Sequence, residues 1–175
     1  YSTLLKKFFN KVFLMRNSNI RLTVPTEPIE IFSEETSLEM FRRMCLIRYF
    51  ELNVKSAYDS GQMSKAPIYL SIGQEAIPAA LATIITNKPA LFGQHRGHGI
   101  YLAFGGDVSK LIDALLGRPT GCAGGMGGSA SIHCPEIKMT GHDGLMGTQV
   151  ADSVGSSLAD KEPAIAFMGD ASAEE

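Results

Sequence analysis

The sequence has no tryptophan, few cysteines and no long apolar run, and these shortages narrow the classes of protein it can belong to. Its three cysteines, an odd number at unrelated spacings, do not suggest a disulfide framework and favour free thiols in a reducing compartment, the cytoplasm. No apolar run approaches the ~18 residues that a membrane-spanning helix needs. The formal charge of −2 gives no general basic field for nucleic acid. We therefore expect neither a membrane nor a nucleic acid as partner.

The composition that remains is that of one globular domain. The 175 residues are 45% apolar and 19% charged, which is enough to bury one sizeable core. All four histidines lie between residues 95 and 142, and fourteen of the 18 glycines lie between residues 93 and 147. Because flexible backbone and imidazole side chains are concentrated in the same part of the chain, we look for chemistry there.

The N-terminal segment, residues 1–32, is interpreted as a basic leader followed by an extended arm. Residues 1–26 hold five basic residues and no acidic one, and prolines follow in residues 23–32. The segment is either a targeting peptide, which would place the protein in the mitochondrial matrix, or an unstructured leader. We favour the leader, because serine and arginine are few. Since the first residue is Tyr1 and not methionine, we expect a fragment or a processed chain.

From residue 33 on, the apolar periodicity predicts helices that alternate with short apolar strands. The expected helices are residues 33–60, 74–86, 108–116 and 149–160, and the expected strands are residues 89–93 and 163–169. The last strand is a continuous apolar run, which is typical of a parallel strand covered on both faces. The sequence thus predicts an α/β domain with a parallel sheet between helices. We expect Arg42, Arg43 and Arg48 on the solvated or partner-facing side of the first helix.

The end of the last strand is the first candidate site. Ligands of open parallel sheets bind beyond the carboxyl ends of the strands, and Asp170 follows such an end. Its carboxylate can hold Mg²⁺ or Ca²⁺, while the backbone N–H groups of Ala171 and Ser172 can face a phosphate. The alternative is that Asp170 simply caps a helix.

Three further glycine-flanked segments are candidates. In residues 94–99, Arg96 can clamp a phosphate through two hydrogen bonds, with His95 and His98 available for donation or proton transfer; an ordinary surface loop is the alternative. Residues 121–129 are either a loop that closes over a site or an inert linker. Residues 141–147 predict a tight turn against a flat ligand or a plain loop. The cysteines and histidines lack the paired spacing of a zinc site.

Taken in order, the motifs resemble those of a known family, the α subunit of the thiamine-diphosphate-dependent 2-oxo acid dehydrogenases. This is the E1 component of the pyruvate, branched-chain 2-oxo acid and acetoin systems. The motifs are YLSIGQEA (69–76), HRGHG (95–99), LAFGGD (102–107), LGRPTG (116–121), GGMGGS (124–129), GLMG (144–147) and GD (169–170). The resemblance covers roughly residues 33–175 and implies the N-terminal part of a three-layer thiamine-diphosphate-binding fold, here truncated.

The resemblance implies roles for particular residues. The residues that would bind the diphosphate are His95, Arg96, Asp170, Ala171 and Ser172, with Asp170 also as the ligand of Mg²⁺. The residues that would hold the aminopyrimidine ring and the bent shape of the cofactor are Gly144, Leu145 and Met146. The catalytic residues, which would line the active-site channel, are His98 and Tyr69.

The resemblance also implies an activity and its partners. The family decarboxylates a 2-oxo acid on thiamine diphosphate and passes the acyl group to the lipoyl domain of an E2 acyltransferase, as an α₂β₂ heterotetramer with an E1 β subunit. Alternatives are another thiamine-dependent transferase or decarboxylase, or an inactive subunit that only pairs with a β partner through the long arginine-bearing helix. In the family, an asparagine beyond the position of Glu175 completes the metal site. We therefore expect residues 1–175 alone not to hold the cofactor tightly.

Overall fold

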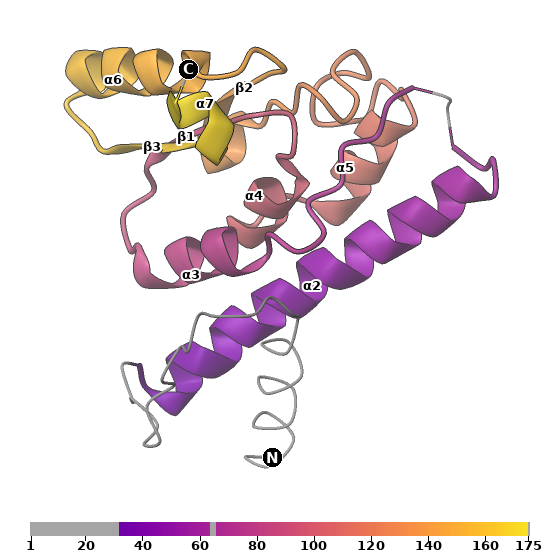
Figure 1. The fold of residues 1–175 in the computed structure, drawn as a ribbon, viewed down its shortest axis with the longest axis horizontal. Coiled ribbons are helices and arrows are strands. Elements are labelled where there is room, and N and C mark those ends of the chain that lie inside the picture. The colour runs from indigo at the N-terminus through magenta and orange to yellow at the C-terminus, as the bar shows by residue number, and fades with distance from the viewer. Residues whose placement is uncertain (1–31, 64–65, 175) are drawn as a thin grey trace, which may run out of the picture. The chain divides into compact units, whose positions relative to one another are not determined.

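The computed structural model describes residues 32–63 and 66–174, so nearly all of the predicted leader and arm lies outside the described residues. Figure 1 shows the arrangement of the elements. The helices are α2 (Glu34–Asp59), α3 (Ala76–Ile84), α4 (His98–Ala103), α5 (Val108–Leu115), α6 (Thr148–Asp160) and α7 (Asp170–Glu174), with a 3₁₀ turn at Pro135–Ile137. The strands are β1 (Ala90–Gly93), β2 (Met139–His142) and β3 (Ala164–Phe167). This mixture of helices with a small sheet confirms the predicted α/β fold.

The sheet has the order β2-β1-β3, and both neighbours run parallel to β1. Gly93, the last residue of β1, pairs with His142 on one side and with Phe167 on the other. The carboxyl ends of the three strands therefore lie at the same edge of the sheet. Helix α6 packs against all three strands.

Strand β2 was not predicted, and this changes the interpretation of residues 141–147. Gly141 and His142 belong to the strand rather than to a turn, which begins only at Asp143. A short strand with a glycine gives little periodic signal. Yet the glycine is required, because a Cβ at Gly141 would lie only 2.1 Å from Cδ1 of Phe92 on β1. The side chain of Phe92 thus occupies the space in which any residue other than glycine at position 141 would place its Cβ.

Strand β3 is parallel, as predicted, but its four residues are only half-buried. It forms an edge of the sheet in the described part of the chain, so no further strand shields its outer side. Phe167 packs edge-to-face on Phe104, with 6.4 Å between the ring centroids. The predicted parallel strand is thus confirmed, with α6 and the core packed against it, but it is half-buried rather than buried as expected.

The core joins α2 and the short helix α4 to the sheet. Every residue of α4 is buried, and α2 turns Ile47, Phe50 and Val54 inward at helical spacing. Helix α4 itself was missed, because six residues that begin with His98 and Gly99 show no full amphipathic period. The starts of two other helices confirm the capping signals. Ser33 accepts a hydrogen bond from the N–H of Thr36, and Asp107 caps α5 in the same way.

The arginines of α2 correct another expectation. Arg43 donates a hydrogen bond to the carbonyl of Ala103 at the end of α4. Arg48 forms two hydrogen bonds with the carboxylate of Glu75, at 2.6 and 3.1 Å. Arg43 is therefore half-buried, whereas the Arg48 side chain stays 47% exposed beside its acceptor, so only Arg43 departs from the expected solvated side of α2. Arg42 is on the surface as expected, with a 3.7 Å pair to Glu39.

The pair between Arg48 and Glu75 fixes α2 to the start of α3. The Glu75 side chain is 5% exposed, and it also accepts a hydrogen bond from the N–H of Gly73. Burial raises the pKa of Glu75, but the hydrogen bonds from Arg48 and Gly73 outweigh it and hold the pKa below its usual value. The described helices are not long and apolar enough to cross a membrane. Cys45, Cys122 and Cys134 are all free thiols, as expected.

We predict that Arg48→Ala lowers the free energy of unfolding by about 1–3 kcal/mol, because it leaves the buried Glu75 carboxylate with one fewer charged partner. Urea denaturation at neutral pH measures the change. Arg42→Ala is the matched control and should cost about 0.5 kcal/mol or less, since its ion pair is exposed and long. Equal losses in the two variants would contradict the structural role given to Arg48.

Candidate functional site at the carboxyl edge of the sheet

The segments that follow the three strands meet at one edge, and a side chain ties the first to the last. Gln94, which follows β1, donates a hydrogen bond of 2.6 Å from Nε2 to the hydroxyl of Ser172. Its Oε1 accepts a 2.7 Å hydrogen bond from the N–H of Gly169, which follows β3. Gly147, at the end of the segment after β2, approaches the same place: a Cβ there would lie 3.9 Å from the carbonyl oxygen of Ser172. Parallel sheets bind their ligands at this edge.

Asp170 begins α7 at this edge and its side chain is exposed. Ala171 is exposed as well, whereas Ser172 is half-buried and held by Gln94. Within residues 32–63 and 66–174, no group of three or more histidine, cysteine or acidic side chains is arranged to hold a metal ion. Of the residues predicted to bind a metal, the structure therefore offers a single carboxylate at an accessible position.

The turn after β2 is held from within while its apolar side chains point outward. Oδ1 of Asp143 accepts hydrogen bonds from the N–H of Leu145 at 2.7 Å and from Nε2 of the buried Gln149 at 2.8 Å. Gln149 also donates a 2.7 Å bond to the carbonyl of Leu145. Leu145 and Met146 are 67% and 53% exposed. Sequence reasoning missed Asp143 and Gln149, although an aspartate before a glycine turn is itself a turn signal.

His95 and Arg96 contact the segment at residues 69–70. The ring of His95 packs edge-to-face on Tyr69, with 4.9 Å between centroids, and its Nδ1 is buried without a hydrogen-bond partner among the described residues. Arg96 is exposed, and one of its guanidinium nitrogens donates a 2.8 Å bond to the carbonyl of Leu70. The structure thus brings together Tyr69, His95 and Arg96, which were predicted for two different parts of the site.

His98 lies deeper than these residues. Its Nδ1 is 3.1 Å from Oε2 of Glu51, and its Nε2 is 2.8 Å from the hydroxyl oxygen of Ser129. Since both ring nitrogens are engaged within the chain, a direct role of His98 in the channel stays a prediction. Glu51 and Ser129 were missed, yet Glu51 carries a signal: it is an acid among the apolar positions that α2 turns to the core.

His142 supports the loop after β1. Its Nδ1 accepts a 2.8 Å hydrogen bond from the N–H of Ile132, and its Nε2 is buried with no partner in the described part. The ring fills the space beside Gly97, where a Cβ would lie 2.3 Å from Nε2. Burial lowers the pKa of His142 to about 4, so the imidazole is neutral near pH 7. An uncharged ring therefore packs under the segment that presents His95 and Arg96.

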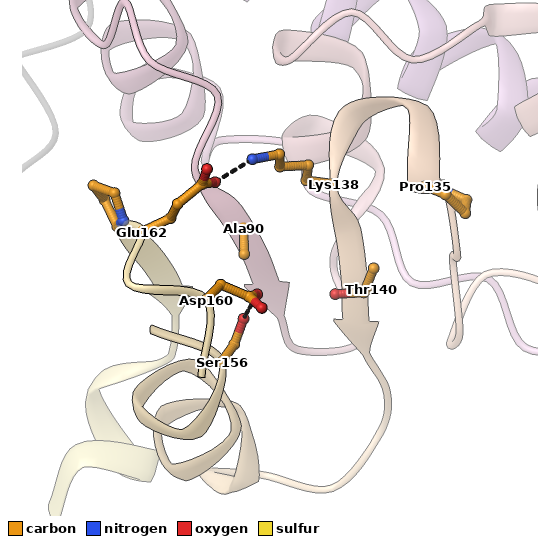
Figure 2. Close-up of a pocket in the computed structure, with 8 residues that line it drawn as sticks. Ala90, Pro135, Lys138, Thr140, Ser156, Asp160 and Glu162 are labelled. Atoms are coloured by element: carbon orange, nitrogen blue, oxygen red, sulfur yellow. Dashed lines mark hydrogen bonds and ion pairs between the residues drawn. The ribbon is translucent and has the colours of Figure 1, made fainter. Parts of the chain in front are cut away.

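Two hollows flank this arrangement, and only one of them includes a predicted site residue. A hollow of about 360 Å³ is lined by Tyr69, by the end of α5 and by residues 125–130 of the glycine-rich loop. The other, of about 240 Å³, lies at the opposite edge of the sheet, beside Ala90, Lys138 and Pro163, where the strands begin. Figure 2 shows this second hollow with the ion pair between Lys138 and Glu162 at its rim. Because it lies at the amino ends, we assign it no role in the site.

A small parallel sheet between helices, with the segments after its strands meeting at the carboxyl edge, defines the class: an α/β protein of the architecture that binds ligands at this edge. Within that class the chain belongs to the dehydrogenase E1 component family, whose model matches residues 42–175. The resemblance identified from the sequence motifs is thereby confirmed.

Similar curated proteins include α subunits of the pyruvate dehydrogenase E1 component. The chain is 33% identical over 156 residues to the mitochondrial α-1 subunit of Arabidopsis thaliana. This match covers 86% of this chain and 40% of that protein. It is 34% identical over 147 residues to the α subunit of Zymomonas mobilis, covering 81% and 41%. It is 31% identical over 127 residues to the mitochondrial α subunit of Saccharomyces cerevisiae, and the match covers 73% of this chain and 30% of that protein. The chain thus spans well under half the length of these relatives.

We predict that Gly97→Ala destabilises the protein by about 1–3 kcal/mol, because the new methyl group overlaps the buried ring of His142. The backbone at Gly97 has φ −86°, which alanine adopts without strain, so the clash is the sole cause. Gly155→Ala is the control: it lies in α6 with nothing within 4 Å of its Cβ, and should stabilise slightly. Urea denaturation measures the free energy of unfolding of both variants. Similar changes in the two would contradict the packing of His142 against Gly97.

The buried His142 also predicts a pH dependence of stability. Between its pKa of about 4 in the folded state and about 6.5 in the unfolded chain, only the unfolded state binds the proton. The free energy of unfolding therefore falls as the pH is lowered through this window. Between pH 7 and 4.5 wild type should lose about 2–3 kcal/mol more than His142→Asn, whose side-chain oxygen can still accept the N–H of Ile132. Parallel losses in urea denaturation at the two pH values would refute this assignment.

Proposed function

We propose that the protein to which this chain belongs decarboxylates a 2-oxo acid with thiamine diphosphate, as the α subunit of an E1 component. The observation that carries the proposal is the convergence of three segments at one sheet edge, residues 94–97, 143–147 and 169–172. The side chain of Gln94 joins the first to the last, and the N–H of Asp143 bonds to the carbonyl of Gly93. The membership of the E1 family supports the same conclusion.

The residues at this edge fit a diphosphate bound through Mg²⁺. Magnesium in proteins is usually held by one or two carboxylates together with phosphate oxygens and water, and Asp170 offers one accessible carboxylate. The N–H groups of Ala171 and Ser172, in the first turn of α7, can donate to the phosphates. Arg96 provides a positive charge from the neighbouring strand end, and a guanidinium suits a phosphate through parallel hydrogen bonds. A highly charged diphosphate requires both counter-charges.

The turn after β2 suits the aminopyrimidine ring. Asp143 and Gln149 fix the backbone of the turn, so the peptide groups of Gly144 and Met146 have a set orientation for hydrogen bonds. The exposed side chains of Leu145 and Met146 would be covered by a flat ring or by the neighbouring subunit. We propose that Gly144, Leu145 and Met146 hold the aminopyrimidine ring and the bent shape of the cofactor.

The chemistry divides between cofactor and protein. When bound, thiamine diphosphate supplies the electron sink that accepts the electron pair left by the departing carbon dioxide. His95 follows Gln94 in the segment after β1, and its buried Nδ1 has no hydrogen-bond partner among the described residues, so we propose it for a hydrogen bond to the diphosphate. Tyr69, packed on His95, is proposed to line the approach of the substrate, and His98 lies behind it. We propose that His95 and Tyr69 bind and orient the reacting groups.

The partners proposed are an E1 β subunit, in an α₂β₂ assembly, and the lipoyl domain of an E2 acyltransferase. Several apolar side chains on the outer face of α2 support an obligate partner, because they are exposed at helical spacing: Leu38, Phe41, Tyr49 and Leu52. The unpaired cysteines favour a reducing compartment, the cytoplasm, with the mitochondrial matrix as the alternative. Product formation that depends on a lipoyl acceptor distinguishes this activity from a transketolase-like transfer or a simple decarboxylation.

Asp170→Asn in the complete protein, assembled with its β partner, tests the proposed metal ligand. It keeps the shape of the side chain and removes its charge, so Mg²⁺-dependent binding of thiamine diphosphate should weaken by more than about tenfold, or about 1.4 kcal/mol. Isothermal titration calorimetry measures the affinity. Asp160→Asn is the control, because Asp160 lines the hollow at the opposite edge of the sheet, and it should bind as wild type does. Unchanged affinity of Asp170→Asn would reject the site.

A further inference from the structure

A chain of buried hydrogen bonds runs from α2 to the glycine-rich loop. Glu51 and His98 are fully buried and Ser129 is 2% exposed. Oε1 of Glu51 accepts two hydrogen bonds from Ser71, one from the N–H at 2.8 Å and one from the hydroxyl at 2.6 Å. Oε2 meets Nδ1 of His98, and Nε2 of His98 meets the hydroxyl of Ser129. The hydroxyl oxygen of Ser129 also accepts a 2.8 Å hydrogen bond from the N–H of Tyr69.

These contacts have one consistent direction. Burial raises the pKa of Glu51, but hydrogen bonds from His98 and Ser71 outweigh it and hold the pKa below its usual value, so the carboxylate only accepts. His98 must then present an N–H at Nδ1, which leaves Nε2 as an acceptor for the hydroxyl proton of Ser129. Because the hydroxyl of Ser129 donates this hydrogen bond to His98, its oxygen still has a lone pair that accepts the N–H of Tyr69. In this arrangement the carboxylate of Glu51, both ring nitrogens of His98 and the hydroxyl of Ser129 all have hydrogen-bond partners.

The last members of this series of hydrogen bonds, Ser129 and Tyr69, both line one hollow. Tyr69 and residues 125–130 line the hollow of about 360 Å³ from facing segments. The loop has few side chains of its own with which to pack, because four of residues 124–129 are glycines. Ser129 is the buried residue among them, and its hydroxyl ties the loop to Tyr69. The position of Tyr69 therefore depends on a side chain that belongs to α2.

We propose that Glu51, acting through His98 and Ser129, positions Tyr69 and the glycine-rich loop across the hollow that both line, and so shapes the substrate side of the site. This deepens the proposed function and rests on it. Glu51, His98 and Ser129 are positioning residues, since none needs to touch the substrate. Their effect on the reaction passes through Tyr69, whose ring packs on His95.

A series of Glu, His and Ser is also the order of a hydrolase triad, but the surroundings do not suit a nucleophile. Ser129 is closed off from solvent, and its oxygen already accepts a backbone N–H. A nucleophilic serine needs an accessible oxygen next to donors for a developing oxyanion. The chain of hydrogen bonds is therefore assigned to positioning rather than to covalent catalysis.

The test uses two variants of the complete protein with its β partner. Ser129→Ala removes the contact with Tyr69, and Glu51→Gln keeps the side-chain shape but places an amide that can donate to Nδ1 of His98. Ser153→Ala is the matched control, because among the described residues this buried hydroxyl bonds to the carbonyl of Val150 in its own helix. Measurements are hydrogen–deuterium exchange of the Tyr69 amide, the ¹⁵N resonances of the His98 ring, and the KM and kcat for a 2-oxo acid with saturating thiamine diphosphate.

We expect the Tyr69 amide to exchange about three- to tenfold faster in Ser129→Ala and in Glu51→Gln than in wild type. Glu51→Gln should also move the ring proton of His98 from Nδ1 to Nε2. In both variants KM should rise several-fold while kcat and cofactor retention change less, and Ser153→Ala should match wild type throughout.

Two results would overturn the proposal: Tyr69 exchange as slow as in wild type in both variants, or faster exchange with KM unchanged, which would make the hydrogen bonds purely structural. Should Glu51→Gln fail to fold, Ser129→Ala alone decides between these outcomes. A wild-type assembly without any decarboxylase activity would instead refute the proposed function. The exchange and ring-proton measurements would then still decide whether Glu51 positions Tyr69.

Discussion

Strand β1 pairs in parallel with β2 on one side and with β3 on the other, and the site depends on this arrangement. Since all three strands run the same way, the segments that leave their carboxyl ends meet at one edge although they lie up to about 75 residues apart in the sequence. One antiparallel strand would carry its segment to the other edge. The glutamine that follows β1 can therefore bond both the backbone and the hydroxyl that follow β3, and it does so at 2.7 and 2.6 Å.

Buried polar side chains, rather than apolar contacts alone, set the positions of the loops. Gln149 holds the turn after β2, His142 packs under the loop after β1, and Glu51 reaches the glycine-rich loop through His98. Such groups are costly to bury unless they are hydrogen-bonded, and each bond also fixes a direction. Gly97 and Gly141 complement them by leaving space for the rings of His142 and Phe92. Short loops with little apolar surface thereby gain defined conformations.

Sequence patterns were sufficient for the elements with a full period or a clear cap, such as α2 with Ser33 and α5 with Asp107. They also identified Asp170 and His95–Arg96 as strand-end residues, because glycines and charges stand out there. They failed for α4 and β2, whose six and four residues are too short to show periodicity. The partners Glu51, Ser129 and Gln149 were missed for another reason: a hydrogen bond between residues distant in sequence leaves no local pattern. An acid at a core position of α2 was the one available hint.

His95 lies where the two halves of the site meet. It belongs to the segment after β1, which Gln94 ties to Ser172 near the proposed diphosphate position. Its ring also packs on Tyr69, which Ser129 holds from the other side. Under the positioning proposed above, a displacement of the glycine-rich loop would reach Tyr69 and, through the ring contact, His95. The proposed holders of the charged cofactor at the sheet edge and the proposed walls of the substrate side would thus meet at His95, which contacts Tyr69 and follows Gln94.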